Sequence, residues 1–223
     1  MLELGVKFLI SYLIGSLMGS MIMGRLRGGV DIREMGSGNP GGTNALRTQG
    51  VWFALGVMII DVGKGVVGAA VVPGLELPFI AEDPGVSREW LTLCCAAAAV
   101  MGHVWPLYHG FRGGKGAATL VGAVAVVAPG ILVPALLVFV VILVLSGFVG
   151  LSTMSAAVTM PAWVAITGLE GKTPLFVFGV FMAGFIIYCH RSNIARMRAG
   201  NENRNEKLML FKRKPQADGN GGV

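Results

Sequence analysis

Residues 117–145 read AATLVGAVAVVAPGILVPALLVFVVILVL, an uncharged apolar run whose length decides how the chain must fold. One membrane helix needs about 20 such residues, so the run is too long for one span and too short for two full ones. Pro129-Gly130 near its middle is a turn signal. Polar backbone at that depth must be buried in protein or line a cavity. We therefore expect a hairpin, with at least one short or half-spanning helix within residues 117–145.

The composition agrees with a chain that lies largely in the membrane. Apolar residues make up 54% and charged residues 13%, whereas soluble domains average about 25% charged, and the mean hydropathy is +0.70. With the hairpin, the apolar runs predict an all-α integral membrane protein with seven transmembrane helices. The other five expected spans cover residues 6–23, 51–72, 91–107, 151–166 and 174–188.

The charges of the connecting segments predict the orientation of these spans. Cations dominate the first loop, the third loop and the tail, whereas acids dominate the second loop; because basic loops stay in the cytoplasm, the N-terminus is expected outside and the C-terminus inside. A single span over residues 117–145 would put the basic tail outside, and the hairpin removes this conflict. The net charge of +6 is thus assigned to orientation, and no nucleic acid partner is expected. The charges that decide are Arg25, Arg27, Arg33, Arg47, Arg112 and Lys115 against Glu76, Glu82, Asp83 and Glu89.

Residues 1–200 are expected to form a single membrane-embedded domain. Residues 201–223 are expected to form a basic polar cytoplasmic tail that is disordered at its end. The three cysteines lie in or beside apolar runs, and their spacing suggests neither disulfides nor a metal site.

The first polar cluster is the segment GSGNPGGTN at residues 36–44, followed by Arg47. Glycine, proline and asparagine in this density do not continue a helix. They can present successive backbone N–H groups in a concave nest that suits a phosphate, and an arginine side chain adds donors that match phosphate oxygens.

The second cluster joins Gly102-His103 to the segment FRGGKG at residues 111–116, with Thr119 shortly after. Gly113-Gly114-Lys115-Gly116 places a cation before a helix N-terminus, where the helix dipole also favours an anion. The segment is not a nucleotide-binding P-loop, because Gly116 stands where that pattern requires Ser or Thr.

The third cluster lies where the last span ends, with His190, Asn193 and Arg196 spaced to share one helix face. Within the spans, Asp61 and Lys64 are three residues apart and are expected to pair, since unpaired charges are costly there. Either a structural pair or support of an active site fits them equally well. Thr153 starts a later span with a hydroxyl that can serve a site or bond its own backbone.

Taken together, these three clusters resemble the signature motifs of the acyl-phosphate-dependent glycerol-3-phosphate acyltransferases of bacteria, the PlsY family. The resemblance extends from the first span to about Glu202, and Cys189 stands where that family usually has Arg. It implies transfer of an acyl group from acyl-phosphate to the 1-hydroxyl of sn-glycerol-3-phosphate in the bacterial inner membrane, with the site at the cytoplasmic face. The products are lysophosphatidic acid and inorganic phosphate, in the first step of phospholipid synthesis. The partners implied are both substrates, membrane lipid and an upstream enzyme that makes acyl-phosphate, and no metal or other cofactor is implied.

The resemblance and the residue chemistry together predict the site. The proton of the attacking hydroxyl could pass to His190 or to a phosphate oxygen of the substrate, and the sequence leaves both open. The expected catalytic residues are His190, Asn193, Lys115 and Thr43. The expected substrate-binding residues are Ser37, Gly38, Asn39, Gly41, Asn44, Arg47, Gly113, Gly114, Gly116, Thr119 and Arg196. Supporting roles are expected for Asp61, Lys64, His103 and Thr153.

Three other classes of protein compete with this interpretation. Acyltransferases with the pattern His, four residues, Asp are excluded, because Tyr108, Gly114 and Ala195 stand five positions after the three histidines. A transporter of an organic phosphate is the main alternative, although transporters often hold their ligands near the bilayer midplane and these clusters lie at span ends on one side. A purely structural membrane protein would not need loops suited to phosphate.

Overall fold

The computed structural model describes residues 1–210, apart from the side chain of Lys207. The predicted disorder at the end of the tail concerns residues outside this range. All regular secondary structure within residues 1–210 is helical, as the sequence predicted. The helices are α1 (Leu2–Gly15), α2 (Gly19–Leu26), α3 (Gly42–Gln49), α4 (Val51–Ala70), α5 (Arg88–Val104), α6 (Ala117–Val127), α7 (Leu132–Ser146), α8 (Val149–Thr167), α9 (Thr173–Cys189) and α10 (Arg191–Arg198). Short 3-10 turns cover Ile32–Glu34, Val72–Gly74, Leu107–His109, Pro129–Ile131 and Glu206–Leu208.

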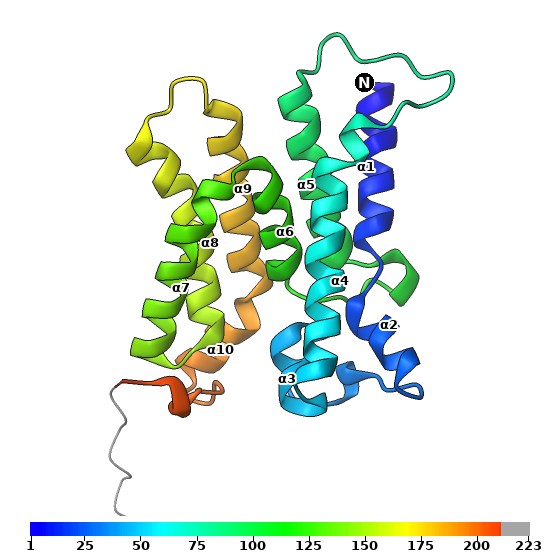
Figure 1. Cartoon of the computed structure of the whole chain (residues 1–223). Coiled ribbons are helices and arrows are strands. Elements are labelled where there is room, and N and C mark those ends of the chain that lie inside the picture. Colours follow the sequence, from blue (N-terminus) through cyan, green and yellow to red (C-terminus); the bar gives the residue numbers. More distant parts are fainter. Residues whose placement is uncertain (211–223) are drawn as a thin grey trace, which may run out of the picture.

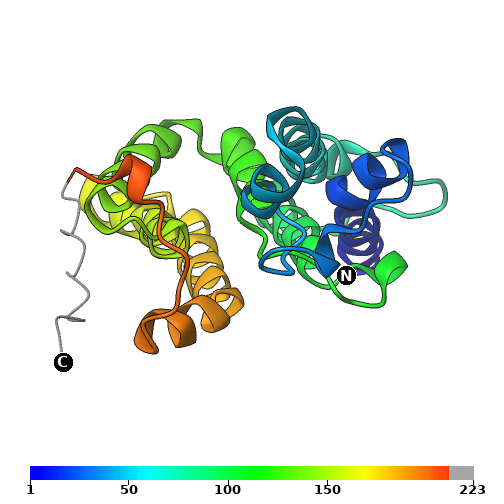
Figure 2. The same ribbon diagram turned by 90° about the horizontal axis from the view of Figure 1, so that it is seen from below.

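The helices form two groups that lie side by side (Figures 1 and 2). One group contains α1, α4 and α5, and the other contains α7, α8 and α9. Helix α6 packs along α4, so it belongs to the first group, and its chain crosses to the second group through the turn Pro129–Ile131. The polar helices α3 and α10 lie at the end of the molecule opposite the N-terminus (Figure 1).

Within residues 1–210, five helical segments are long and apolar enough to cross a membrane: Leu2–Leu26, Val51–Gly74, Arg88–His109, Pro129–Ser146 and Val149–Thr167. A sixth is obtained if α9 and α10, which meet at 54°, are one broken span. The expected break within residues 117–145 is confirmed, because α6 has only 11 residues and ends just before Pro129. The chain is therefore a multi-pass helical protein with one short apolar helix, while the total of seven spans stays a prediction.

The first expected span, residues 6–23, is not one continuous helix. It is interrupted between α1 and α2, where the backbone loses its helical partners. Two side chains of α4 replace them: Lys64 donates to the Leu17 carbonyl at 2.6 Å, and the Gly19 N–H donates to Asp61 at 3.2 Å. Asp61 and Lys64 also pair with each other at 3.0 Å, as expected from their spacing. The buried ion pair thus satisfies an irregular backbone inside the protein, which is the condition for such backbone in a membrane.

Glycines hold α6 tightly against α4. A Cβ on Gly65 would lie 2.0 Å from the Thr119 carbonyl oxygen, and a Cβ on Gly122 would lie 2.0 Å from the Val62 carbonyl oxygen. Small residues at such crossings let helix backbones approach closely in a membrane. This contact fixes the position of α6, and with it the loop that precedes it.

Candidate active site

A cavity of about 590 Å³ lies between the two groups of helices, with polar groups at one end and apolar groups along the rest. The polar end is formed by the loop before α3, the N-terminal part of α3, the end of the loop before α6, and the junction of α9 and α10. Its residues are Ser37, Asn39, Gly41, Gly42, Thr43, Asn44, Arg47, Asp61, His103, Lys115, Gly116, His190, Asn193, Arg196, Glu202 and Asn203. The cavity therefore brings together residues of all three polar clusters of the sequence.

The loop before α3 owes its shape to Asn44, which is 1% exposed. Its amide nitrogen donates to the carbonyls of Ile32 and Met35, each at 2.9 Å, and its amide oxygen accepts the Ser37 N–H at 3.0 Å. Both amide protons are thus committed to the loop backbone. We assign Asn44 to shaping the site rather than to donating to a ligand.

Helix α3 begins at the cavity wall without a side-chain cap. Gly41 is its N-cap residue, and Gly42 and Thr43 start the helix and line the cavity. Uncapped N–H groups and the helix dipole make such a terminus suited to an anion. Arg47, one turn further along α3, lines the same wall.

The loop before α6 lies directly on the imidazole of His103. The Gly114 N–H donates to the His103 carbonyl at 3.1 Å, and a Cβ on Gly114 would lie 2.2 Å from His103 Nε2. On its other side, His103 Nδ1 lies 3.4 Å from the Asp61 carboxylate. The ion pair that stabilises the α1–α2 break therefore also supports the loop that carries Lys115.

Gly114→Ala is expected to lower kcat/KM about 100-fold, mainly through a higher KM for the ligand that contacts Lys115. The new methyl group cannot share space with His103, so the loop must move, and displacements of about 1 Å at a reaction site cost about this much. Steady-state kinetics of the purified variant measure it. Gly85→Ala is the control, because a Cβ there meets no atom within 4 Å. Unchanged KM in Gly114→Ala would contradict the packing described.

A hydrogen-bonded network links the second and third clusters. The Lys115 ammonium donates to the side-chain oxygen of Asn193. The Asn193 amide nitrogen donates to Glu202 at 2.8 Å, and Arg196 Nε donates to the other oxygen of Glu202 at 2.6 Å. These contacts hold α10 and the segment after it against the Lys115 loop.

The Lys115 ammonium lies in surroundings that disfavour its charge. The pKa of Lys115 is lowered to about 8, mainly by burial and also by the positive charge of Arg196, while Glu202 opposes the change. An additional anion in the cavity would favour the charged ammonium.

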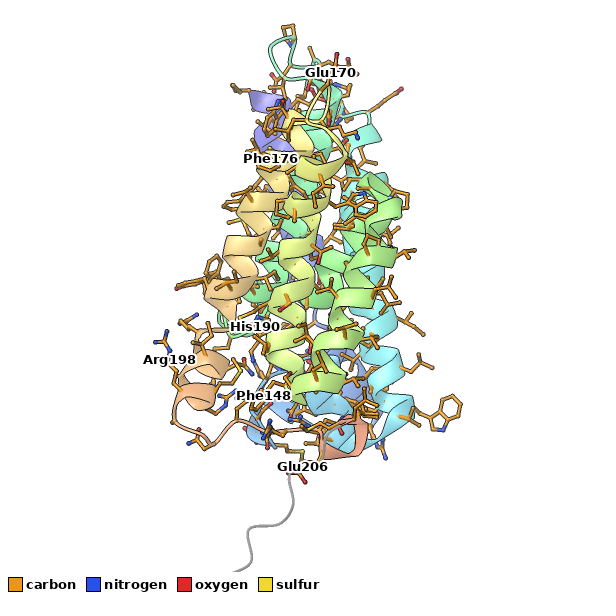
Figure 3. The ribbon with its side chains drawn as sticks, turned by 90° about the vertical axis from the view of Figure 1, so that its left-hand side faces the viewer. Phe148, Glu170, Phe176, His190, Arg198 and Glu206 are labelled. Atoms are coloured by element: carbon orange, nitrogen blue, oxygen red, sulfur yellow. The ribbon has the colours of Figure 1, made fainter. Side chains whose placement is uncertain are left out.

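His190 lies at the junction of α9 and α10 (Figure 3), is 4% exposed and lines the cavity. Its Nδ1 lies 2.8 Å from the Ile186 carbonyl oxygen. Since a carbonyl only accepts, Nδ1 carries a proton, and Nε2 of the neutral ring is then a proton acceptor. Nε2 can therefore accept a hydrogen bond or a proton from a group in the cavity, although burial lowers the pKa of His190 to about 4.

Several expected site residues do not line the cavity. Thr119 is fully buried because α6 packs closely against α4, and its hydroxyl has no hydrogen-bond partner among the described residues. The expectation that Thr119 contacts substrate is not supported by this placement. Gly38, Lys64, Gly113 and Gly114 are also absent from the lining. Thr153 lines the apolar part, but its hydroxyl donates to the Val149 carbonyl at 2.9 Å.

Sequence reasoning missed Glu202 and Asn203 as parts of the cavity wall. An acidic residue is not expected in a site suited to anions, and only the closeness of Glu202 to the third cluster pointed to it. At Cys189, where the resembled family has Arg, the neighbouring Arg191 does not take that place. Its guanidinium lies over the Tyr188 ring at 4.5 Å from the centroid, and the residue is absent from the cavity wall. Within residues 1–210, no group of His, Cys, Asp or Glu side chains is arranged to hold a metal ion.

A helical membrane protein with a cavity that is cationic at one end and apolar along the rest belongs to the class that handles amphipathic phosphate compounds. Comparison with known proteins defines it further. Residues 6–200 match the family model described as glycerol-3-phosphate acyltransferase, and the chain belongs to that family. Membership of an acyltransferase family favours an enzyme over the transporter alternative.

Individual relatives and solved structures agree with this family assignment. The glycerol-3-phosphate acyltransferase of Chlorobaculum parvum is 38% identical over 216 residues, covering 87% of this chain and 93% of the relative. That of Chlorobium phaeobacteroides is 37% identical over 228 residues, covering 92% and 97%. The crystal structure of PlsY, an integral membrane glycerol 3-phosphate acyltransferase, in its glycerol 3-phosphate form superposes with a TM-score of 0.76 at 28% identity, covering 92% of this chain and 96% of that one. Its lysophosphatidic acid form gives a TM-score of 0.74 at 28% identity, covering 90% and 94%.

Proposed function

We propose that the chain transfers an acyl group from acyl-phosphate to the 1-hydroxyl of sn-glycerol-3-phosphate, releasing 1-acyl-glycerol-3-phosphate and inorganic phosphate. The single observation that carries the proposal is the two-part cavity. Its polar end offers Lys115, Arg47 and the uncapped start of α3 to phosphate groups, and its apolar part offers a place for an acyl chain. Both substrates bring a phosphate, and one of them also brings a long hydrocarbon.

The polar end divides naturally between two phosphates. The backbone N–H groups at the start of α3, with Thr43, hold the phosphate of the acyl donor. Lys115, Arg47, Ser37 and Asn193 hold glycerol-3-phosphate, an assignment that follows the family resemblance. In this arrangement the attacking hydroxyl and the acyl carbonyl meet beside His190.

The reaction is an acyl transfer through a tetrahedral intermediate. The 1-hydroxyl oxygen bonds to the carbonyl carbon while negative charge develops on the carbonyl oxygen, and N–H donors stabilise that charge, each by roughly 3 kcal/mol. The carbon–oxygen bond to phosphate then breaks, and inorganic phosphate leaves with the bonding electrons. The hydroxyl proton passes to His190 Nε2, with a phosphate oxygen as the competing acceptor, since its second pKa is about 6.

Asp61, Lys64 and His103 have a positioning role in this scheme. The three side chains are at most 5% exposed, and they support the Gly113–Gly116 segment from beneath. A paired, hydrogen-bonded set of charges keeps its geometry when the cavity fills, so Lys115 meets phosphate without moving its loop.

The membrane arrangement follows the same logic. We infer seven spans, with the N-terminus outside and the C-terminus in the cytoplasm of a bacterium, and a site at the cytoplasmic face of the inner membrane. The basic loops and the joining of all three polar clusters at one cavity support this orientation. Residues 1–200 then form one membrane-embedded domain. Glycerol-3-phosphate arrives from the cytoplasm, the acyl donor arrives from the bilayer, and an upstream enzyme supplies acyl-phosphate.

The deciding experiment mixes purified protein with an acyl-phosphate, with and without glycerol-3-phosphate. We expect release of inorganic phosphate only when glycerol-3-phosphate is present, together with an equal amount of lysophosphatidic acid. Acyl-CoA as the donor is the comparison, and it is expected to give far less product. Phosphate release that does not depend on glycerol-3-phosphate would overturn the proposal, and preference for the thioester would overturn the assigned donor.

A further inference from the structure

The apolar part of the cavity has a closed end, and this end bears on the length of the acyl chain. We propose that Met160 of α8 and Ile131 of the turn before α7 form an end wall that limits the acyl chain and so sets the chain-length preference. The inference rests on the proposed function, because it takes the apolar part of the cavity to hold the acyl group.

One face of α8 forms a continuous floor for a chain. Gly150, Thr153, Ala156, Ala157 and Met160 all line the cavity, and their spacing places them on one helix face. A Cβ on Gly150 would lie 3.0 Å from the Asn193 amide nitrogen, so this residue marks the polar end. With a rise of about 1.5 Å per residue, Met160 lies about 15 Å further along the helix. The lining residues of α8 between Gly150 and Met160 are small, so Met160 is the first large side chain on this face.

Buried side chains close the far end of this helix face. Met160 and Ile131 are 4% and 5% exposed, and they belong to one buried cluster with Phe178 and Met182 of α9. The Met160 side chain fills the space over Gly179, where a Cβ would lie 3.2 Å from Met160 Cγ. The turn that carries Ile131 crosses between the two groups of helices, as Figure 2 shows. A chain that runs along α8 from the polar end therefore meets side chains fixed by packing.

The side of the cavity is different from its end. Val121 of α6 and Leu136 of α7 line it, and they are 47% and 62% exposed, in contrast to the buried residues of the end wall. This side suits entry of an acyl chain from the bilayer. If the acyl chain extended out through this side into the bilayer, the end wall would not limit its length. The experiment must distinguish this arrangement from a chain that ends at the end wall.

The test compares saturated acyl-phosphates in a graded series, each longer than the last by two carbons. The measured quantity is kcat/KM for each donor, expressed as a ratio to the shortest. Met160→Ala opens space at the end wall and is expected to move the preferred donor to the next longer one. The ratio for that donor should rise roughly tenfold, since burial of each additional methylene is worth about fourfold in binding.

A second variant is expected to shift the chain-length preference in the opposite direction, so the proposal can be tested even if Met160→Ala does not fold. Ala157→Leu fills the floor before the end wall and is expected to shift the preference to a shorter donor. Ile131→Ala should act in the same direction as Met160→Ala. Val158→Ala is the matched control. Val158 directly follows Ala157 in α8, is 44% exposed and does not line the cavity. This variant should leave every ratio unchanged.

The ratio is independent of the fraction of active protein, so a weak preparation still gives a result. Active Met160→Ala and Ala157→Leu with the wild-type ratios would overturn the end wall and indicate that the chain leaves sideways. Wild-type protein that makes no lysophosphatidic acid from any donor would instead overturn the proposed function, and the two failures are therefore distinguished.

Discussion

Lys115→Ala is expected to lower kcat/KM for glycerol-3-phosphate by about 10²–10³-fold, because removing one partner of a buried, hydrogen-bonded charge pair typically costs about 2–5 kcal/mol. The reason is geometric as well as electrostatic. Lys115 is the cation of the second loop that reaches the polar end of the cavity, and its position is fixed by Asn193 on one side and by the glycine loop over His103 on the other. Alanine at this position removes the positive charge and the hydrogen bond to Asn193. Steady-state kinetics with varied glycerol-3-phosphate measure the loss.

Two further variants isolate the role of the Lys115 charge. Lys172→Ala removes an exposed lysine beside Glu170, at the end of the molecule away from the site, and should leave activity unchanged (Figure 3). The second variant, Lys115→Arg, tests the titration. The pKa of Lys115 is lowered from 10.5 to about 8, so its cation is present below pH 8 and is lost above it. Wild-type kcat/KM should fall above pH 8, and the arginine variant should not show this fall, because arginine keeps its charge. Near-normal turnover of Lys115→Ala would remove Lys115 from the site.

His190→Ala is expected to lower kcat by about 10²–10⁴-fold with a smaller change in KM, which is the usual contribution of a positioned general base. The Ile186 carbonyl holds Nδ1–H, so Nε2 of the neutral ring is free to accept a proton, and His190 lines the cavity. Separate determination of kcat and KM measures the effect.

The opposite result for His190→Ala, a change in KM rather than in kcat, would also assign a role to His190. A raised KM with kcat almost unchanged would assign the proton to a substrate phosphate oxygen and leave His190 as a positioning residue. His109→Ala is the matched control, because His109 lies in the turn Leu107–His109 and is absent from the cavity wall. It should change neither constant.

Much of the fold could be predicted from the sequence, because the membrane restricts the possible structures so strongly. The break in residues 117–145 followed from helix length and from Pro129, and the structure has it. The break between α1 and α2 did not follow, because an apolar run reads the same whether its helix is continuous or interrupted. The evidence for that break lay in Asp61 and Lys64, which serve a backbone more than 40 residues away. Such a partner is visible only in three dimensions.

The candidate site shows the same division. Polar, glycine-rich segments could be found from the sequence, because few other roles explain them at span ends. The direction of individual side chains could not be found in this way. Asn44 reads as a ligand yet holds its own loop, and Thr119 reads as a ligand yet is fully buried outside the cavity wall. Glu202 is not among the expected site residues, although its side chain is only 7% exposed and accepts hydrogen bonds from both Asn193 and Arg196.

The position of Glu202 means that two donors of an anion-binding wall already hold an anion that belongs to the protein. A phosphate that takes these donors replaces one negative group by another, so the free energy gained is a difference between two attractions. When the phosphate departs, the tethered carboxylate can return at once and without a diffusional search. Under the proposed function, the cationic wall therefore keeps a negative partner after the phosphate departs, which weakens the retention of the released phosphate.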